Sequence, residues 1–349
     1  MERPIIISGL RKSGTSLVKS LLDNHPDLFV FPPNELHFFR YSAHPSLVKD
    51  KLARMEKNDE LFHALAMSSF IRRMGDKRSE YYQPEFDPHT FNELIRSGQP
   101  KDHRDVYNLL FEAMYASLYG ETLPQGVRCV SKTVLETEFF PEWLSMYPDC
   151  RFVYVLRNPY AHFVSAVRSL RTHTGRNNRR KNRSTYEGMP LHAIDDPYPF
   201  LGPELGRMRH SYYFMEKYAR LYPDHFHILV YDELIRSPEH EMKKLCGFLD
   251  IRYDPHLLEP TLLGRPWKGN SWHSPELDGI DTRPLNEWKK HISGGEVRLL
   301  NRYFRGLIDR HFELQLPYSS LLWPFHASEY KPWVYLGNRF LYYSSPDIC

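Results

Sequence analysis

The sequence has few of the residues and patterns that define several protein classes. Only four of its 349 residues are cysteine. None lies in a Cys-x-x-Cys pair or has a histidine at zinc-ligand spacing, so neither a disulfide framework nor a zinc site is indicated. No run of about 18 apolar residues occurs, so no membrane span is predicted. No signal peptide precedes the first apolar run, because Met1-Glu2-Arg3 leads directly into Pro4. We therefore predict a cytoplasmic protein with reduced thiols.

The sequence also lacks a large excess of positive or negative charge. The 46 Lys and Arg residues nearly balance the 43 Asp and Glu residues, which gives a formal net charge of +3 and does not indicate a nucleic-acid partner. The 18 histidines form no His-Glu-x-x-His or related ligand pattern, so no metal site is predicted. With 41% hydrophobic and 26% charged residues, the chain has the composition of a globular protein with a sizeable core.

Short apolar runs alternate with helical patterns along the chain. Strands are expected at about 5–7, 28–31, 127–130, 151–156 and 226–231, and helices at about 14–24, 136–146, from 159 onward, 238–249 and 294–312. Strands separated by helices form βαβ units, so we predict an α/β fold with a central parallel sheet flanked by helices. Residues 1–314 are expected to form one domain with a helical insertion at about 45–120. The aromatic-rich tail, 315–349, is expected to pack on this domain or on a partner.

The first strand runs into a glycine-rich stretch with the spacing of a phosphate-binding loop. Residues 9–16 read Gly-Leu-Arg-Lys-Ser-Gly-Thr-Ser, and backbone N–H groups of such a turn at a helix N-terminus bind phosphate. A nucleoside triphosphate site would carry lysine where Thr15 stands, and magnesium on the next residue. Here the lysine is Lys12, inside the variable part of the loop. Triphosphate hydrolysis is therefore disfavoured, which leaves another phosphate-bearing ligand or a plain tight turn.

These residues resemble the 5′-phosphosulfate loop of sulfotransferases, which use 3′-phosphoadenosine 5′-phosphosulfate (PAPS). The loop sequence Arg-Lys-Ser-Gly-Thr-Ser is followed by Leu-Asp-Asn-His-Pro-Asp, as in that family. Residues 33–39, Pro-Asn-Glu-Leu-His-Phe-Phe, are similar to a stretch of heparan sulfate 3-O-sulfotransferases in which the glutamate is the catalytic base. Protein-tyrosine sulfotransferases also place a catalytic glutamate in about this region. The resemblance implies a P-loop-like sulfotransferase fold and a PAPS-dependent enzyme with no metal.

A second anion site is expected for the 3′-phosphate of PAPS. Arg157 follows the apolar run 151–156, at the strand end where open α/β sheets bind ligands, and its guanidinium suits bidentate phosphate contact. Alone, such an arginine is more often a surface ion-pair residue. The Arg-x7-Ser spacing to Ser165 resembles the family's 3′-phosphate site. Later matches imply that Tyr231 contacts the adenine side and that Ser271 and Arg283 belong to a loop closing over the nucleotide, where the family usually has lysine at position 283.

The resemblance also implies chemical roles. Sulfuryl transfer requires an activated acceptor hydroxyl, in-line approach and cations near the bridging oxygen. Glu35 is expected to be the general base, with Lys12 at the leaving phosphate oxygen and Lys132 at the sulfuryl group. His37 either orients Glu35 or the acceptor, or is a structural residue. The residues expected at the 5′-phosphate are Arg11, Lys12, Ser13, Gly14, Thr15 and Ser16.

The acceptor is less defined by the sequence. A basic run over residues 168–183 is either a solvated loop or an attractor for an acidic glycan, and the similarity around Glu35 favours a carbohydrate hydroxyl. A peptide tyrosine, or a small-molecule alcohol or phenol, stays open, as does assembly into a homodimer. Two other classes are retained as alternatives: a P-loop nucleotide kinase and a non-catalytic nucleotide-binding module.

Overall fold

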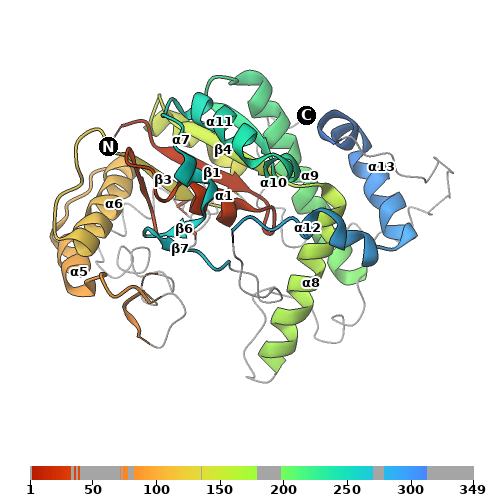
Figure 1. The fold of residues 1–349 in the computed structure, drawn as a ribbon, viewed down its shortest axis with the longest axis horizontal. Coiled ribbons are helices and arrows are strands. Elements are labelled where there is room, and N and C mark those ends of the chain that lie inside the picture. The colour runs from red at the N-terminus through yellow and green to blue at the C-terminus, as the bar shows by residue number, and fades with distance from the viewer. Residues whose placement is uncertain are drawn as a thin grey trace.

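A five-stranded parallel sheet organises the protein in the computed structural model (Figure 1). The structure describes residues 2–32, 35–36, 38–39, 71, 74–77, 82–134, 136–178, 198–269 and 279–312. The strand order is β2-β3-β1-β4-β5. The strands are β1 (Ile5–Gly9), β2 (Leu28–Val30), β3 (Arg128–Lys132), β4 (Arg151–Leu156) and β5 (Phe226–Val230). The predicted α/β class with a central parallel sheet is therefore confirmed.

The central strand β1 is apolar on both faces because helices cover both. Ile5, Ile6 and Ile7 are fully buried, as expected for a strand inside a parallel sheet. Ile5 and Ile7 belong to one core cluster and Ile6 to the other, because successive side chains of a strand point to opposite faces. β1 pairs with β3 on one side, with Ile5 opposite Val130, and with β4 on the other, with Gly9 opposite Val155.

Three helices cover the first face of the sheet: α1 (Thr15–Leu22), α10 (Tyr231–Arg236) and α11 (Pro238–Leu249) (Figure 1). In α1, Leu17, Val18, Leu21 and Leu22 recur at helical spacing and are buried in the core that also contains Ile5 and Ile7. A short 3₁₀ turn, η4 (Pro255–Leu258), packs beside α1 and α11. The first face thus fixes the helix that follows the glycine-rich loop.

Larger, more aromatic helices cover the second face. They are α6 (His103–Tyr119), α7 (Phe140–Met146), α8 (Pro159–Asn178), α9 (Tyr198–Leu221) and α13 (Gly294–His311). Trp143 and Phe140 of α7 are fully buried, and the ring of Phe140 contacts those of Phe152 on β4 and Phe226 on β5. Aromatic side chains therefore build much of this layer.

The remaining elements are short or peripheral. They are α5 (Pro88–Ser97), η2 (Thr137–Phe139), β6 (Thr261–Leu262), β7 (Arg265–Pro266), α12 (Pro284–Glu287) and η5 (Trp288–Lys290). α5 begins at Pro88, and the Asp87 side chain caps it by accepting hydrogen bonds from the backbone N–H groups of His89 and Thr90. β6 and β7 form an antiparallel hairpin. The expected domain division stays a prediction, and most of residues 45–81 and all of 315–349 lie outside the described residues.

Several elements differ from the sequence-based expectation. The strand predicted over 226–231 ends at Val230, and Tyr231 begins α10. The long helix α9, Tyr198–Leu221, was not expected.

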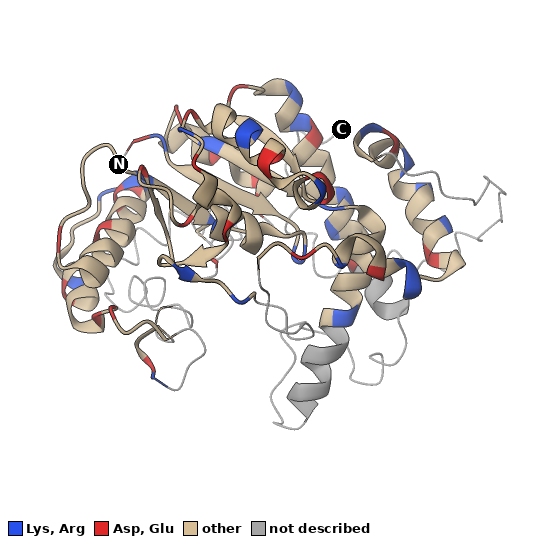
Figure 2. Ribbon diagram, viewed as in Figure 1, with Lys and Arg blue, Asp and Glu red and all other residues tan. Residues whose placement is uncertain are grey.

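Figure 2 shows basic and acidic residues interspersed along α11 and α13, in keeping with the small net charge. Among the described residues, no helix combines the length and apolar character needed to cross a membrane.

Candidate active site

The glycine-rich loop joins β1 to α1 at the carboxyl edge of the sheet, and two of its glycines are required there. Gly9 and Gly14 both have positive φ angles, 150° and 100°, which L-residues with a side chain rarely adopt. A Cβ atom on Gly9 would lie 2.8 Å from the Val155 carbonyl oxygen, and one on Gly14 would overlap the ring of Tyr231. The loop therefore approaches β4 and α10 more closely than any other residue type would permit.

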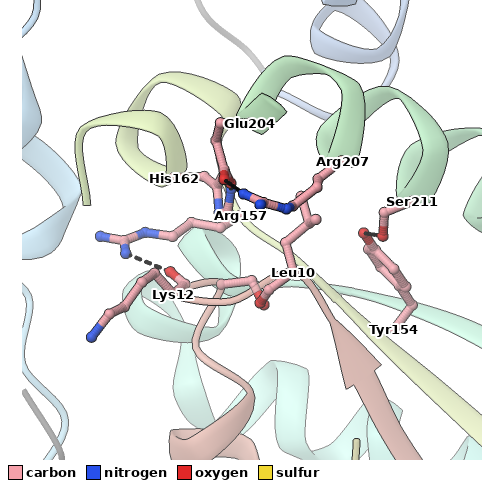
Figure 3. A network of polar contacts seen from close by, with 9 residues as sticks. Leu10, Lys12, Tyr154, Arg157, His162, Glu204, Arg207 and Ser211 are labelled. Atoms are coloured by element: carbon pink, nitrogen blue, oxygen red, sulfur yellow. Dashed lines mark hydrogen bonds and ion pairs between the residues drawn. The ribbon is translucent and has the colours of Figure 1, made fainter. Parts of the chain in front are cut away.

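Lys12 is held in the left-handed region by its neighbours. Its φ is 66°, which costs a non-glycine residue about 1 kcal/mol or more. Arg157, which follows β4, donates from Nη1 to the Lys12 carbonyl oxygen at 2.8 Å (Figure 3). Within the loop, the Ser13 hydroxyl donates to the Leu10 carbonyl oxygen at 2.7 Å. In Figure 3, the side chains of Lys12 and Arg157 extend to the same side, away from the Tyr154–Ser211 pair.

A lysine, a serine and a glutamate meet at the head of α1. Lys132 ends β3, and its Nζ donates to Ser16 Oγ at 3.0 Å and lies 3.4 Å from Glu35 Oε1. The Lys132 side chain is 2% exposed and that of Glu35 is 17% exposed. The N–H of Leu36 donates to the Lys132 carbonyl oxygen at 2.8 Å, so the segment that carries Glu35 lies directly beside the end of β3. Three residues that are distant in sequence thus form one polar contact.

Positive charge accumulates around the loop. Burial lowers the pKa of Lys12, and the neighbouring charges of Lys132, Arg11 and Arg157 lower it further, while Glu35 acts to raise it. Burial also lowers the pKa of Lys132, against the charge and hydrogen bond of Glu35. Three of the four charged groups that act on Lys12 are cations. The residues present therefore fit a ligand with several negative charges, because such a ligand would relieve this mutual repulsion.

Arg157 is oriented by an aromatic ring as well as by the loop. Its guanidinium carbon lies 5.2 Å from the centre of the Tyr231 ring, at cation–π distance, and that same ring packs against Gly14. Ser165 lies farther along α8 and is half-buried. Arg157 therefore lies on the Tyr231 ring, and the ring lies on Gly14. This stack connects the end of β4, α10 and the loop.

Two residues missed by sequence reasoning hold this stack in place. Asp232 accepts a hydrogen bond from the Asn158 N–H at 3.0 Å, and the Asn158 side chain accepts one from the Tyr160 N–H at 2.9 Å, which caps α8. Burial raises the pKa of Asp232. The available signals were the Asn-Pro pair at the start of a helix and an acidic residue directly after Tyr231.

A buried charged cluster lies behind Arg157 and was also missed. His162 Nε2 lies 3.1 Å from Glu204 Oε1, and Arg207 Nη1 donates to Glu204 Oε2 at 2.8 Å (Figure 3). Burial alone would raise the pKa of Glu204, but the hydrogen bonds and charges of His162 and Arg207 outweigh it and lower that pKa to about 2. The cluster joins α8 to α9. Glu204 and Arg207 are three residues apart on α9, but His162 lies 42 residues before Glu204, so no local motif marks the whole cluster.

The other expected site residues are placed less centrally. Arg283 lies at the exposed start of α12, where its Nε donates to Asp281 Oδ1 at 2.8 Å, and this bond does not join it to the loop cluster. Thr15 is buried at the first position of α1, and Arg11 is exposed on the loop. His37 and Ser271 lie outside the described residues.

A family model described as the sulfotransferase family matches residues 4–255. The chain belongs to the sulfotransferase family. The match includes the loop, Glu35, Lys132, Arg157 and Tyr231 in one continuous region. It confirms the resemblance and the expected class of enzyme, a sulfotransferase, and with the parallel sheet it confirms the P-loop-like sulfotransferase fold.

Solved structures of similar fold include two sulfotransferase domains. That of the Synechococcus PCC 7002 olefin synthase is 17% identical and has a TM-score of 0.55, covering 91% of this chain and 98% of that one. That of the curacin biosynthetic pathway is 20% identical and has a TM-score of 0.52, covering 90% and 99%. An uncharacterized protein of Aquifex aeolicus (strain VF5) is 22% identical over 316 residues, 89% of this chain. The chain spans about a third (34%) of the length of that curated relative.

Proposed function

We propose that this sulfotransferase moves the sulfuryl group of PAPS to an acceptor hydroxyl, with Glu35 as general base. The observation that carries the proposal is the contact of Glu35, Lys132 and Ser16 at the head of α1, beside the cation-rich loop. Such an arrangement would supply a carboxylate for the acceptor proton and ammonium groups for developing negative charge.

The donor would be held at two places. Backbone N–H groups of the loop, with Arg11, Ser13, Gly14, Thr15 and Ser16, would hold the 5′-phosphate, as a helix N-terminus favours. Arg157 and Ser165 would hold the 3′-phosphate. The Tyr231 ring would contact the donor on its adenine side. When bound, PAPS supplies an already activated sulfuryl group, so the proposal requires no metal ion.

Glu35 is proposed to accept the proton of the acceptor hydroxyl. Its carboxylate is 17% exposed and so can meet an acceptor hydroxyl while one of its oxygens faces Lys132. Taking up that proton leaves the acceptor oxygen nucleophilic. Lys132, held by Ser16, keeps its ammonium beside the carboxylate, and Lys12 extends from the loop as the second cation. Both lysines would steady negative charge on the oxygens around the transferred group.

We propose a carbohydrate hydroxyl as the acceptor. The similarity of residues 33–39 to glycan sulfotransferases supports it, and so does the basic run that begins on α8 at Arg168, eleven residues after Arg157. An acidic glycan would be attracted to such a run. A peptide tyrosine and a small alcohol or phenol remain as alternatives, since each also presents a hydroxyl.

Calorimetry with 3′-phosphoadenosine 5′-phosphate (PAP) and with ATP plus magnesium tests the donor. We expect micromolar binding of PAP only, and a preference for ATP would overturn the proposal in favour of a kinase.

An acceptor screen with labelled PAPS then compares an N-sulfated heparosan oligosaccharide, a tyrosine peptide and p-nitrophenol. Label on the oligosaccharide is expected, and label on either of the others instead would overturn the carbohydrate assignment.

Substitution of the base tests the mechanism. Glu35→Gln should lower kcat about 100-fold or more, the usual contribution of general base catalysis, with PAP affinity unchanged. The matched control is Glu93→Gln on α5, where the glutamate side chain is exposed and lies 3.6 Å from His89 Nδ1. Normal turnover by Glu35→Gln would support a non-catalytic role for this residue.

A further inference from the structure

Lys19 is a buried lysine on α1 to which the proposed function gives no role. Its residue exposure is 5%, although lysine is almost never buried without a partner. Ser16 and Lys19 are three residues apart in one helix and therefore lie on neighbouring positions of one face. Ser16 contacts Lys132, and Lys19 donates from Nζ to the Pro32 carbonyl oxygen at 2.6 Å. One face of α1 thus contacts both β3 and the segment after β2.

That segment carries Glu35 and has backbone contacts at both ends. The Phe31 N–H donates to the Val130 carbonyl oxygen and the Leu36 N–H to the Lys132 carbonyl oxygen, each at 2.8 Å. Between them lie Pro32 and Pro33, which have no N–H group to donate to β3. The bond from Lys19 therefore reaches the segment at Pro32, three residues before Glu35. At the two prolines the backbone of the segment has hydrogen-bond acceptors but no donors.

The charge environment of Lys19 agrees with a role as a hydrogen-bond donor. Burial, and after it the charge of Lys132, lower its pKa to about 7, although Asp23 and Glu35 act to raise it. A lysine amine donates a hydrogen bond whether it is charged or neutral. A methionine would fill similar space without the cost of burying an amine, so packing alone does not account for a lysine here.

We propose that Lys19 is a positioning residue for the base: by holding the Pro32 carbonyl against α1, it fixes Glu35 beside Lys132 and the phosphate loop. The inference rests on the proposed function, because it requires Glu35 to be the base. It couples the helix that would hold the donor phosphate to the segment that would deprotonate the acceptor. Loss of the bond should therefore impair turnover more than donor binding.

Two variants separate the donor role from packing. Lys19→Met removes the hydrogen bond and keeps the volume, whereas Lys19→Gln keeps an N–H donor without the charge. Kinetics are measured with whichever of the three screened acceptors is labelled fastest. Lys19→Met should lower kcat about 10-fold, while the Kd of PAP and the KM of PAPS stay within about 2-fold of the parent values. Lys19→Gln should recover kcat to within about 3-fold of the parent. The matched control is Lys243→Met, which removes an exposed lysine paired with Glu239.

Rates are normalised to the fraction of molecules that bind PAP, so that misfolded protein does not enter the comparison. If Lys19→Met keeps the parent kcat, or if Lys19→Gln is as slow as Lys19→Met, the inference is wrong. Glu35→Gln is measured in parallel. If it abolishes turnover while Lys19→Met does not, the inference fails and the proposed function stands. If Glu35→Gln turns over normally, the base assignment fails and the role of Lys19 falls with it.

Discussion

The ammonium of Lys132 lies 3.4 Å from a carboxylate oxygen of Glu35, in a contact where the lysine side chain is 2% exposed and the glutamate 17%. The two residues come from different elements, the end of β3 and the segment after β2. Removing one partner of a mostly buried pair leaves the other charge poorly compensated. The charge of the candidate base therefore depends in part on Lys132.

Replacing Lys132 tests this relationship directly. Lys132→Met should lower kcat about 100-fold, because it removes a contact of Glu35 and the cation that we propose lies beside the transferred group. PAP affinity should fall less, because the loop backbone and Arg157 remain. Steady-state kinetics with calorimetry separate the two effects, and Lys217→Met on α9 serves as the control. An equal loss in kcat and in PAP affinity would assign Lys132 to donor binding instead.

Two glycine substitutions distinguish backbone strain from loss of the site. Gly14→Ala should weaken PAP binding more than 10-fold, because the new Cβ overlaps the Tyr231 ring. Gly126→Ala is the matched control, since Gly126 also has a positive φ, 90°, but open space around it. It should cost about 1 kcal/mol of stability and leave PAP binding unchanged. Equal effects of both substitutions on PAP binding would contradict the stack of Arg157, Tyr231 and Gly14.

The assignment of Arg157 to the 3′-phosphate predicts a change in selectivity. Arg157→Lys should weaken PAP binding about 10-fold, because a lysine cannot make a bidentate contact or stack on Tyr231 equally well. Binding of adenosine 5′-phosphate, which has no 3′-phosphate, should change little. Arg305→Lys on α13, where the exposed side chain pairs with Asp309, should alter neither affinity. Equal weakening of both nucleotides by Arg157→Lys would place Arg157 elsewhere on the donor.

The Glu204 cluster should stabilise the fold in a pH-dependent way. The pKa of Glu204 in the folded chain is about 2, below its ordinary 4.5, so its contribution is present above pH 4.5 and is lost as the pH falls toward 2. Glu204→Gln should lower the free energy of unfolding at pH 7 by about 3 kcal/mol. The difference from the parent should narrow below pH 4.5 in denaturant titrations. Glu233→Gln, at a half-exposed pair with Arg236, should cost at most about 1 kcal/mol.

Lys19 predicts a pH dependence of stability with the same sign, at higher pH. Its pKa is about 7 in the folded chain and 10.5 ordinarily, so between these values the unfolded chain holds more protons and folding becomes more favourable as the pH rises. The stability of the parent relative to Lys19→Met should therefore increase by at most about 1.4 kcal/mol per pH unit from pH 7.5 to 9.5. Denaturant titrations at several pH values measure it. A stability difference that is independent of pH would mean that Lys19 titrates normally.

Sequence reasoning located the parts of the site that leave a local pattern. The glycine spacing marked the loop because Gly9 and Gly14 must adopt positive φ, and the apolar run 151–156 marked β4 and hence Arg157. The long helix α9 was missed because two prolines and two glycines interrupt the helical pattern in its first half. Tyr231 was assigned to the strand because it continues an apolar run, although the acidic residues that follow it are typical of a helix start.

Contacts between distant segments could not be read in this way. Glu35 and Lys132 lie 97 positions apart, and both were expected at the site only through family resemblance. Nothing in their local sequence indicates that they meet. The bond from Lys19 to Pro32 spans only 13 positions, yet it depends on how α1 packs over the end of β2, which is a property of the folded sheet.

The position of β1 has a consequence for how the enzyme assembles. Its partners in the sheet are β3 and β4, and the loop that follows it is completed by Arg157, 145 positions beyond Lys12. Such long-range pairing is slow, because the entropy of closing a large loop is lost before the contacts form. The α5–α6 pair, by contrast, is local in sequence. Helices can therefore form before the candidate site is complete, and binding of the proposed nucleotide donor would report that all five strands have paired.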